Sequence, residues 1–447
     1  MDQLASPARF HATREAMAAP PTLRPAPRRL PRPLPENPAV ADSGRPFEER
    51  PDECPLARAV RCLRGQLPPP SSFLRACVII PAKDEATNLP ATLAALAGQV
   101  DGAGRPLPPA EVEVIVLANN CQDHTAEVVR AAAAQHPRLA LHVAELHLPP
   151  AEAHVGRARR LLLDEAARRL EIVEAPGSGL LLSTDADTLV APTWVWATRQ
   201  EAAAGAEAVA GRILTAKAAL AASAAAAAAP ADSRCPVRAL QVRDAAYRLL
   251  LTQLEHRLDA APADPWPRHH QHFGASLAVT VRAYRRVGGL PVVPFLEDEA
   301  LWQLLRQHDL PVRHSPHVRV VTSPRRCGRV EVGLSWQLRE WAQLAETGQE
   351  PLVPCCHELA RVWRARRRLR AWWQQGQRQA SPELLRLAQA VEVPLPELLV
   401  EARRAGTFGQ FWHWVEQRRG AVLPVPLAGA MRALRAYLRD GESCGRL

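Results

Sequence analysis

The chain has 447 residues, of which 47% are hydrophobic and 23% are charged, and this balance is typical of a globular protein. The formal net charge is +10, but arginine is spread along the chain and no recognition-helix, zinc-finger or RNA-binding signature accompanies it. These properties argue against a nucleic-acid-binding function, and we predict no nucleic-acid partner.

Residues 1–72 are rich in proline and arginine and are predicted to be mostly disordered, because they offer no apolar core. A short helix near 55–64 is the exception. From residue 73 the sequence alternates between short apolar runs and longer helical patterns. The apolar runs predict strands at 77–80, 112–117, 139–143, 179–183 and 206–214. The intervening segments predict helices at 88–99, 125–135, 154–170 and 194–204.

Repeated strand–helix units of this length predict an α/β fold with a mainly parallel sheet that helices cover on both faces. The domain is expected to span 73–330 and to contain an Ala-rich insertion at about 216–235. After the insertion, the pattern predicts a helix at 236–258, a strand at 274–279, a helix at 299–307 and a strand at 312–321.

Residues 331–447 are expected to form a helical C-terminal extension, with helices at 334–345, 357–375, 382–405 and 427–439. The second of these helices is basic and amphipathic, so a peripheral membrane contact is an open prediction. The longest low-polarity stretch, 218–230, is too short to cross a bilayer. The nine cysteines form no C-x-x-C pair and are odd in number, and the N-terminus has no apolar secretory core. We therefore predict a cytoplasmic protein without a transmembrane segment.

Four polar loops follow strands of the predicted domain and are expected to meet at one edge of the sheet. They lie within 79–89, 116–125, 179–188 and 274–301. The third loop places Asp185 and Asp187 one residue apart, directly after an apolar strand. Two carboxylates without a neighbouring basic residue indicate a hard divalent cation, Mg²⁺ or Mn²⁺, whose shell substrate phosphates often complete. A solvated Asp-rich turn is the alternative interpretation.

Three other polar clusters have a structural interpretation beside a functional one. The acids Glu297, Asp298 and Glu299 precede a helix, where negative charge meets the helix dipole favourably. Arg157 shares its stretch with two further arginines, which is typical of a solvated helix face. The histidines within 269–272 have no cysteine partners and consecutive side chains point apart, so we predict no zinc site there.

With these motifs in this order, residues 75–325 resemble the nucleotide-sugar-dependent glycosyltransferases of family 2, which have the GT-A (Rossmann-like) fold. Pro81, Asp84 and Glu85 match the family's Pro-x-x-(Asn/Asp)-Glu motif, so the resemblance implies that they line the pocket for base and ribose. It also implies that the neighbouring Ala82 and, after the second strand, Asn119 contact the donor nucleotide.

The resemblance assigns roles to the remaining motifs. Asp185 and Asp187 match the metal-binding D-x-D motif, with Asp185 also close to the donor. Arg157 lies in a Gly-(Lys/Arg)-Ala segment and would face the diphosphate. Glu297 and Asp298 match the pair that supplies the acceptor-side base. The resemblance therefore implies a nucleotide-diphospho-sugar donor, a divalent metal, Mg²⁺ or Mn²⁺, and transfer of one sugar to an unidentified acceptor hydroxyl.

The sequence departs from the family pattern in two places. The second strand ends in Ala-Asn-Asn-Cys, so Asn119 replaces the usual carboxylate on the nucleotide. The Gln-x-x-Arg-Trp motif of the processive synthases is absent from the sequence, which argues against polymerisation. Candidates for a third metal ligand are His314 and His317, and the arginines at 325, 326 and 329 are candidates for a phosphate contact.

Inversion at the anomeric carbon is the expected outcome, because Asp298 would remove the acceptor proton while oxocarbenium character develops. A metal at Asp187, held directly or through water by Asp185, would stabilise the departing diphosphate. Three alternatives stay open: a retaining GT-A transferase, a nucleotidyltransferase, and a degenerate module that binds sugar nucleotides without turnover. The loop after the first strand lacks the Gly-rich signature expected of a nucleotidyltransferase.

Overall fold

The computed structural model describes residues 54–173, 179–216, 235–325, 333–376 and 379–440. The chain divides into two units, 1–49 and 50–447, and every described residue lies in the second. The predicted disorder of residues 1–53 and all but the ends of the predicted Ala-rich insertion fall outside the described residues.

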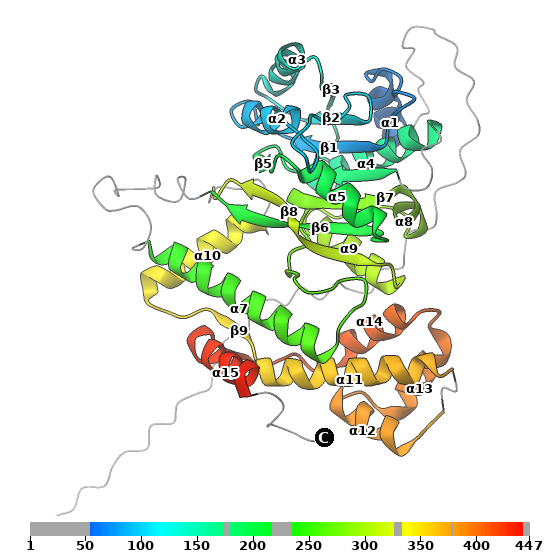
Figure 1. Ribbon diagram of the computed structural model, residues 1–447, viewed down its shortest axis with the longest axis vertical. Coiled ribbons are helices and arrows are strands. Elements are labelled where there is room, and N and C mark those ends of the chain that lie inside the picture. The colour runs from blue at the N-terminus through cyan, green and yellow to red at the C-terminus, as the bar shows by residue number, and fades with distance from the viewer. Residues whose placement is uncertain (1–53, 174–178, 217–234, 326–332, 377–378, 441–447) are drawn as a thin grey trace, which may run out of the picture. The chain divides into compact units, whose positions relative to one another are not determined.

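Eight strands form one sheet in the order β3-β2-β1-β4-β7-β6-β8-β5 (Figure 1). Their bounds are β1 Ala76–Ala82, β2 Val112–Asn119, β3 Ala140–Leu146, β4 Leu180–Ser183, β5 Thr188–Val190, β6 Ala208–Thr215, β7 Leu277–Thr280 and β8 Val312–Thr322. The pairs β1–β2, β2–β3, β1–β4 and β6–β8 are parallel. Strand β7 runs antiparallel to β4 and β6, and β5 runs antiparallel to β8. The predicted α/β class with a mainly parallel sheet is confirmed.

The central strands are buried on both faces, which explains their unbroken apolar sequences. Along β1, Cys77 and Ile79 belong to one core cluster, whereas Val78 and Ile80 belong to another. The first cluster is completed by α1 Pro55–Gly65, α4 Val155–Ile172, α8 Val281–Arg286 and α9 Glu297–Gln307. The second is completed by α2 Leu89–Ala97, α3 Thr125–Gln135 and α5 Trp194–Ala203. Helices therefore cover both faces, and the short helix expected near 55–64 is α1.

The pairing of β4 with β7 joins two of the predicted loops. The end of β4 lies beside the start of β7, because Ser183 pairs with Leu277 in antiparallel register. The Ser183 hydroxyl donates to the carbonyl of Gly274 (3.1 Å), and the Thr184 hydroxyl donates to that of Ala275 (3.0 Å). The short 3₁₀ turn Gly274–Ser276 is thereby fixed against the loop that carries Asp185 and Asp187.

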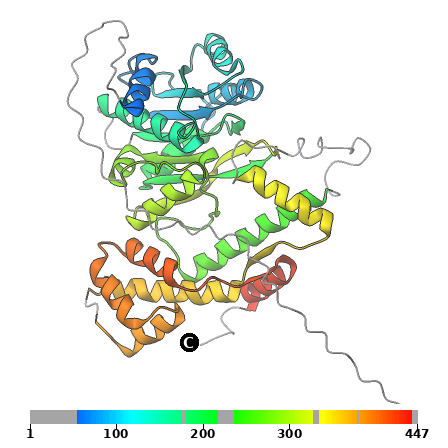
Figure 2. The ribbon, with the colours of Figure 1, turned by 180° about the vertical axis from the view of Figure 1, so that it is seen from behind.

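The remaining helices follow as α7 Pro236–Leu258, α10 Leu334–Thr347, α11 Cys356–Gln374, α12 Pro382–Ala390, α13 Leu395–Arg404, α14 Phe408–Arg418 and α15 Leu427–Asp440, with a small sheet of β9 Leu352–Pro354 and β10 Pro424–Pro426. Helix α7 contacts α10, α11 and α15, and Figure 2 shows this group from behind. Within the described ranges, no helix is both long enough and apolar enough to cross a bilayer.

The predicted helix 382–405 was wrong in one respect, because the structure has two helices, α12 and α13, in its place. Glu392 between them adopts a left-handed backbone conformation (φ 58°), and Pro394 caps α13. A residue before proline avoids the helical conformation, so the chain breaks here. Helix α14 has no counterpart among the predicted helices.

Candidate functional site

Two aspartates stand at the carboxyl end of β4, on a turn whose backbone is firmly held. The amide of Thr184 donates to the carbonyl of Ile79 on β1, and the hydroxyl of Thr92 on α2 donates to the carbonyl of Ala186 (2.9 Å). The side chain of Asp187 is 10% exposed, whereas that of Asp185 is 39% exposed. The turn therefore presents both carboxylates at one edge of the sheet, with Asp187 the more buried.

Arg159 on α4 links this turn to the start of α9. Its guanidinium contacts Asp185 Oδ1 at 2.7 Å and Glu297 Oε1 at 2.9 Å, and its side chain is 4% exposed. The guanidinium lies so close to Gly274 that a Cβ there would overlap it. A glycine before β7 is therefore required by the buried arginine.

Arg157, the arginine predicted to face the diphosphate, lies two residues earlier on the same helix and pairs with Glu152 instead. Residues two apart on a helix point to different sides, so only Arg159 reaches the acidic turn. The glycine of the Gly-Arg-Ala segment has a packing role, because a Cβ at Gly156 would overlap the carbonyl of Val293. Arg159 was missed by the sequence analysis, because nothing in the local sequence distinguishes it from Arg157 and Arg160.

Asp298 lies in the first turn of α9, held by backbone donors. Its Oδ2 accepts from the amide of Gly274 (2.6 Å), and its Oδ1 accepts from the amide of Glu299 (2.8 Å). Leu296, which precedes the helix, has a left-handed backbone (φ 58°) that turns the chain into α9. The carboxylate is thus oriented by the loop that the hydroxyls of Ser183 and Thr184 fix to β4.

Arg325, which follows β8, supplies a second cation to the site. Its guanidinium contacts Glu85 Oε1 at 2.7 Å and Asp187 Oδ2 at 3.1 Å. Glu85 is buried, and Asn88 donates to its other oxygen (2.6 Å). The hydroxyl of Thr322 contacts the second oxygen of Asp187 at 3.5 Å. The structure therefore brings Glu85 and Asp187 together on either side of one arginine.

The carboxylates outnumber these two arginines. Burial and the charges of Asp185 and Glu85 raise the pKa of Asp187 to about 6, against the opposing charge of Arg325. The pKa of Asp185 is also raised, by its partly buried position and by the nearby charge of Asp298, against the opposing charge of Arg159. Burial likewise raises the pKa of Glu297. Several oxygen ligands with incompletely balanced negative charge are the donor set that Mg²⁺ and Mn²⁺ prefer, so these residues fit a divalent cation.

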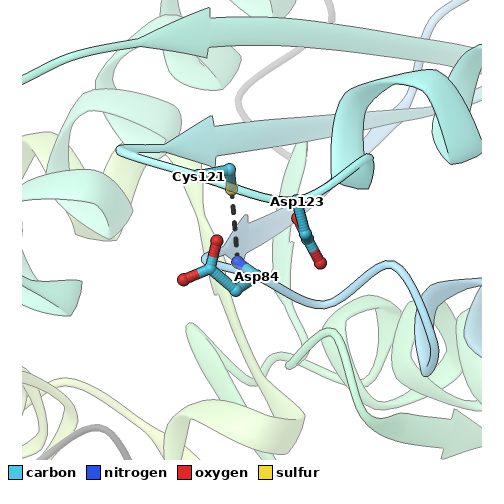
Figure 3. A group of neighbouring side chains, drawn as sticks. All are labelled: Asp84, Cys121 and Asp123. Atoms are coloured by element: carbon cyan, nitrogen blue, oxygen red, sulfur yellow. Dashed lines mark hydrogen bonds between the residues drawn. The ribbon is translucent and has the colours of Figure 1, made fainter.

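The loops after β1 and β2 form a second cluster, shown in Figure 3, in which Asp84, Cys121 and Asp123 offer ligand atoms within 4.8 Å of one another. The backbone amide of Asp84 donates to Cys121 Sγ (3.3 Å), and the amide of Gln122 donates to Asp84 Oδ1 (2.6 Å). Asp123 accepts from the backbone amide of Ala86 (3.0 Å). These contacts clamp the two loops together, and they place Asp84 within that clamp.

Asn119, at the end of β2, is buried, and its Oδ1 has no hydrogen-bond partner within the described part of the chain. A buried amide oxygen without a donor is costly, so a ligand N–H is a natural partner for it. Pro81 and Ala82 close strand β1, pairing with Leu117 and Ala118 of β2. The predicted nucleotide contacts thus lie at the ends of two adjacent parallel strands.

The two histidines considered as metal ligands lie on β8. The His314 ring nitrogen Nδ1 contacts Asp264 Oδ2 at 2.8 Å, so this ring is engaged in a buried polar network. His317 is exposed on the same strand. Among the histidines within 269–272, for which no zinc site was predicted, His272 stacks on Trp302 (4.1 Å between ring centroids) and contacts Glu299 (2.6 Å).

Part of the chain matches a known protein family, and several solved structures are similar to it. Residues 77–220 match the family model described as "Glycosyl transferase family 2". No curated protein matches the sequence. One similar solved structure is the mannosyltransferase PcManGT from Pyrobaculum calidifontis in complex with GDP-Man and Mn²⁺. Its sequence identity is 18% and its TM-score is 0.37, and the alignment covers 87% of this chain and 95% of that chain.

Two further solved structures are similar at the same level. TarS from S. aureus in complex with UDP-GlcNAc has 12% identity, with 77% of this chain and 90% of that chain covered and a TM-score of 0.39. Glucosyl-3-phosphoglycerate synthase from Mycobacterium tuberculosis has 16% identity, with 68% and 88% covered and a TM-score of 0.32. The match at 77–220 confirms the predicted resemblance to family 2 glycosyltransferases, and the sheet has the mainly parallel architecture that the sequence predicted.

Proposed function

We propose that the chain is a metal-dependent, inverting transferase that moves one sugar from a nucleotide-diphospho-sugar to an acceptor hydroxyl. The observation that carries the proposal is a chain of contacts between Asp185 and the start of α9. Arg159 pairs with both Asp185 and Glu297, and the amide of Gly274, which lies against Arg159, donates to Asp298. A metal-binding pair beside a backbone-oriented carboxylate is the arrangement that such a transfer needs.

The metal would be held by Asp187 and, directly or through water, by Asp185. When bound, the ion would supply Lewis-acid stabilisation of charge on the departing diphosphate. Glu85 and Arg325 border Asp187, so the donor would approach the acids from the ends of β1 and β8. Asn119 would accept from the base through its unpartnered amide oxygen, with Pro81, Ala82 and Asp84 forming the neighbouring wall.

Asp298 would act as the general base. The acceptor oxygen bonds to the anomeric carbon while the bond to the diphosphate oxygen breaks, and the acceptor proton passes to Asp298. Amide donors on both carboxylate oxygens hold this group in one orientation. Glu297 has a supporting part, because its pairing with Arg159 anchors the first turn of α9. Arg157 would reach the diphosphate only by leaving Glu152.

The proposal is tested by measuring donor hydrolysis and sugar transfer with UDP- and GDP-sugars, with and without Mn²⁺. Asp187→Asn should remove Mn²⁺-dependent turnover, and Asp298→Asn should slow transfer by about 10²–10⁴-fold while nucleotide binding persists. Glu171→Gln is a matched control, since Glu171 is an exposed acid in the last turn of α4, where it pairs with Arg285.

Each alternative predicts a different result. Unchanged transfer by Asp298→Asn would remove the base assignment, and a product with retained configuration would identify a retaining enzyme. Nucleotide binding at Asn119 without turnover of any donor would favour the binding module.

A further inference from the structure

Arg325 holds the space between Glu85 and Asp187. One of its terminal nitrogens lies 2.7 Å from Glu85 Oε1 and 3.1 Å from Asp187 Oδ2, and the other lies 3.3 Å from Glu85 Oε2. The two carboxylate side chains are 4% and 10% exposed. A single monovalent cation therefore lies between two buried acids and offsets only part of their negative charge.

This position conflicts with metal binding at Asp187. With Arg325 against Oδ2 and the Thr322 hydroxyl near Oδ1, both oxygens of Asp187 already have neighbours that donate to them. A divalent ion bound to the same carboxylate would lie within a few ångströms of the guanidinium, and two cations at that distance repel strongly. The ion and the arginine cannot both keep their closest contacts with Asp187.

The two arginines of the site differ in their freedom to move. The side chain of Arg159 is 4% exposed, and its two terminal nitrogens are held by Asp185 and by Glu297. The side chain of Arg325 is 35% exposed and extends from the chain beyond β8. Arg325 can therefore swing from the acids toward solvent, where a planar guanidinium binds a phosphate group through two hydrogen bonds.

We propose that Arg325 is an exchangeable counter-cation, which occupies the acidic site in the donor-free protein and transfers to the donor diphosphate when the metal enters. This inference rests on the proposed function. The exchange keeps charge in balance, because a divalent cation replaces a monovalent one at Asp187 while the displaced positive charge meets the incoming diphosphate.

Removing the Arg325 charge should then have opposite effects on two ligands. Arg325→Gln should bind Mn²⁺ alone more tightly than the wild type, by about tenfold, because the ion no longer competes with the guanidinium. The same variant should bind UDP and GDP at saturating Mn²⁺ more weakly, by about tenfold or more, because the diphosphate loses a charged partner. Arg325→Lys should lie between the two proteins for both ligands.

The experiment uses the full chain, with free Mn²⁺ followed by electron paramagnetic resonance and nucleoside diphosphate binding followed by calorimetry. Arg130→Gln, which removes an exposed arginine paired with Glu145 on the surface, is the matched control and should change neither affinity. Thermal unfolding of each variant verifies that it is folded. An Arg325→Gln protein with unchanged or weaker affinity for Mn²⁺ alone would overturn the inference.

Asp187→Asn separates this inference from the proposed function. If Asp187→Asn abolishes Mn²⁺ binding but Arg325→Gln does not strengthen it, the metal site stands and the exchange by Arg325 is refuted. If Asp187→Asn binds Mn²⁺ as the wild type does, the proposed metal site fails and the inference falls with it.

Discussion

Replacing Asp187 by asparagine should make the metal-free protein more stable at neutral pH. The pKa of Asp187 is raised from 3.8 to about 6 by burial and by neighbouring carboxylates, so the folded protein binds this proton more tightly than the unfolded chain does. The contribution of Asp187 to stability is therefore greatest below pH 4 and is lost as the pH rises through about 6. At about 1.4 kcal/mol per pH unit, the ionised carboxylate costs the fold up to about 3 kcal/mol at pH 7.5.

Asparagine keeps the shape of the side chain and removes this cost, but it also weakens the contact with Arg325. We expect a net gain of about 1–2 kcal/mol in the free energy of unfolding at pH 7.5, and a smaller gain at pH 5. The assay is urea unfolding with a chelator present, at both pH values. Saturating Mn²⁺ should reverse the order of the two proteins, because the ion stabilises only the wild type.

Asp123→Asn provides the opposite control. Although burial acts to raise it, hydrogen bonds from Thr125 and from the backbone of Ala86 lower the pKa of Asp123, so its ionised form is stabilising above the unfolded pKa. Asparagine at this position should therefore destabilise the protein at pH 7.5. A metal-free Asp187→Asn protein that is less stable than the wild type at pH 7.5 would refute the electrostatic account of the site.

Three further predictions follow from the same contacts. Arg159→Gln should lower the free energy of unfolding by about 3–5 kcal/mol in urea denaturation, because it leaves the buried Glu297 unpaired. Arg157→Gln should change it little, and equal losses would contradict the different positions of the two arginines. The affinity for Mn²⁺, measured by calorimetry, should fall as the pH drops below about 6, since the proton competes with the ion for Asp187; a constant affinity down to pH 5 would place the ion elsewhere. Asn119→Ala should weaken UDP or GDP binding by about tenfold in the same assay, and unchanged binding would show that the buried amide does not contact the base.

The sequence predicted the strands and acids of this site because each lies in a local pattern. Asp185 and Asp187 follow an apolar run that predicts a buried strand, and the carboxyl ends of such strands share an edge. The choice between Arg157 and Arg159 could not be predicted, because it depends on how α4 is rotated against the sheet. The ion pair of Arg325 with Glu85 joins residues 240 positions apart, and no local pattern records such a contact.

The break between α12 and α13 is a different case. Its signal, a proline at 394, was present in the sequence, but a periodic apolar pattern on both sides concealed it. The buried contact of His314 with Asp264 could not be predicted either. It depends on tertiary structure, because the loop that contains Asp264 is distant from β8 in the sequence and packs against it only in the fold.

The pairing of β4 with β7 limits the relative motion of the two segments that position the proposed donor and acceptor groups. The acids that would hold the donor metal follow β4, and the carboxylate that would activate the acceptor accepts from the amide of Gly274, just before β7. The hydroxyls of Ser183 and Thr184 tie these two segments together. A hinge motion therefore cannot separate the loop after β4 from the turn before β7. Under the proposed function, the sheet itself would align donor with acceptor, and adaptation to new acceptors would be left to the surrounding loops.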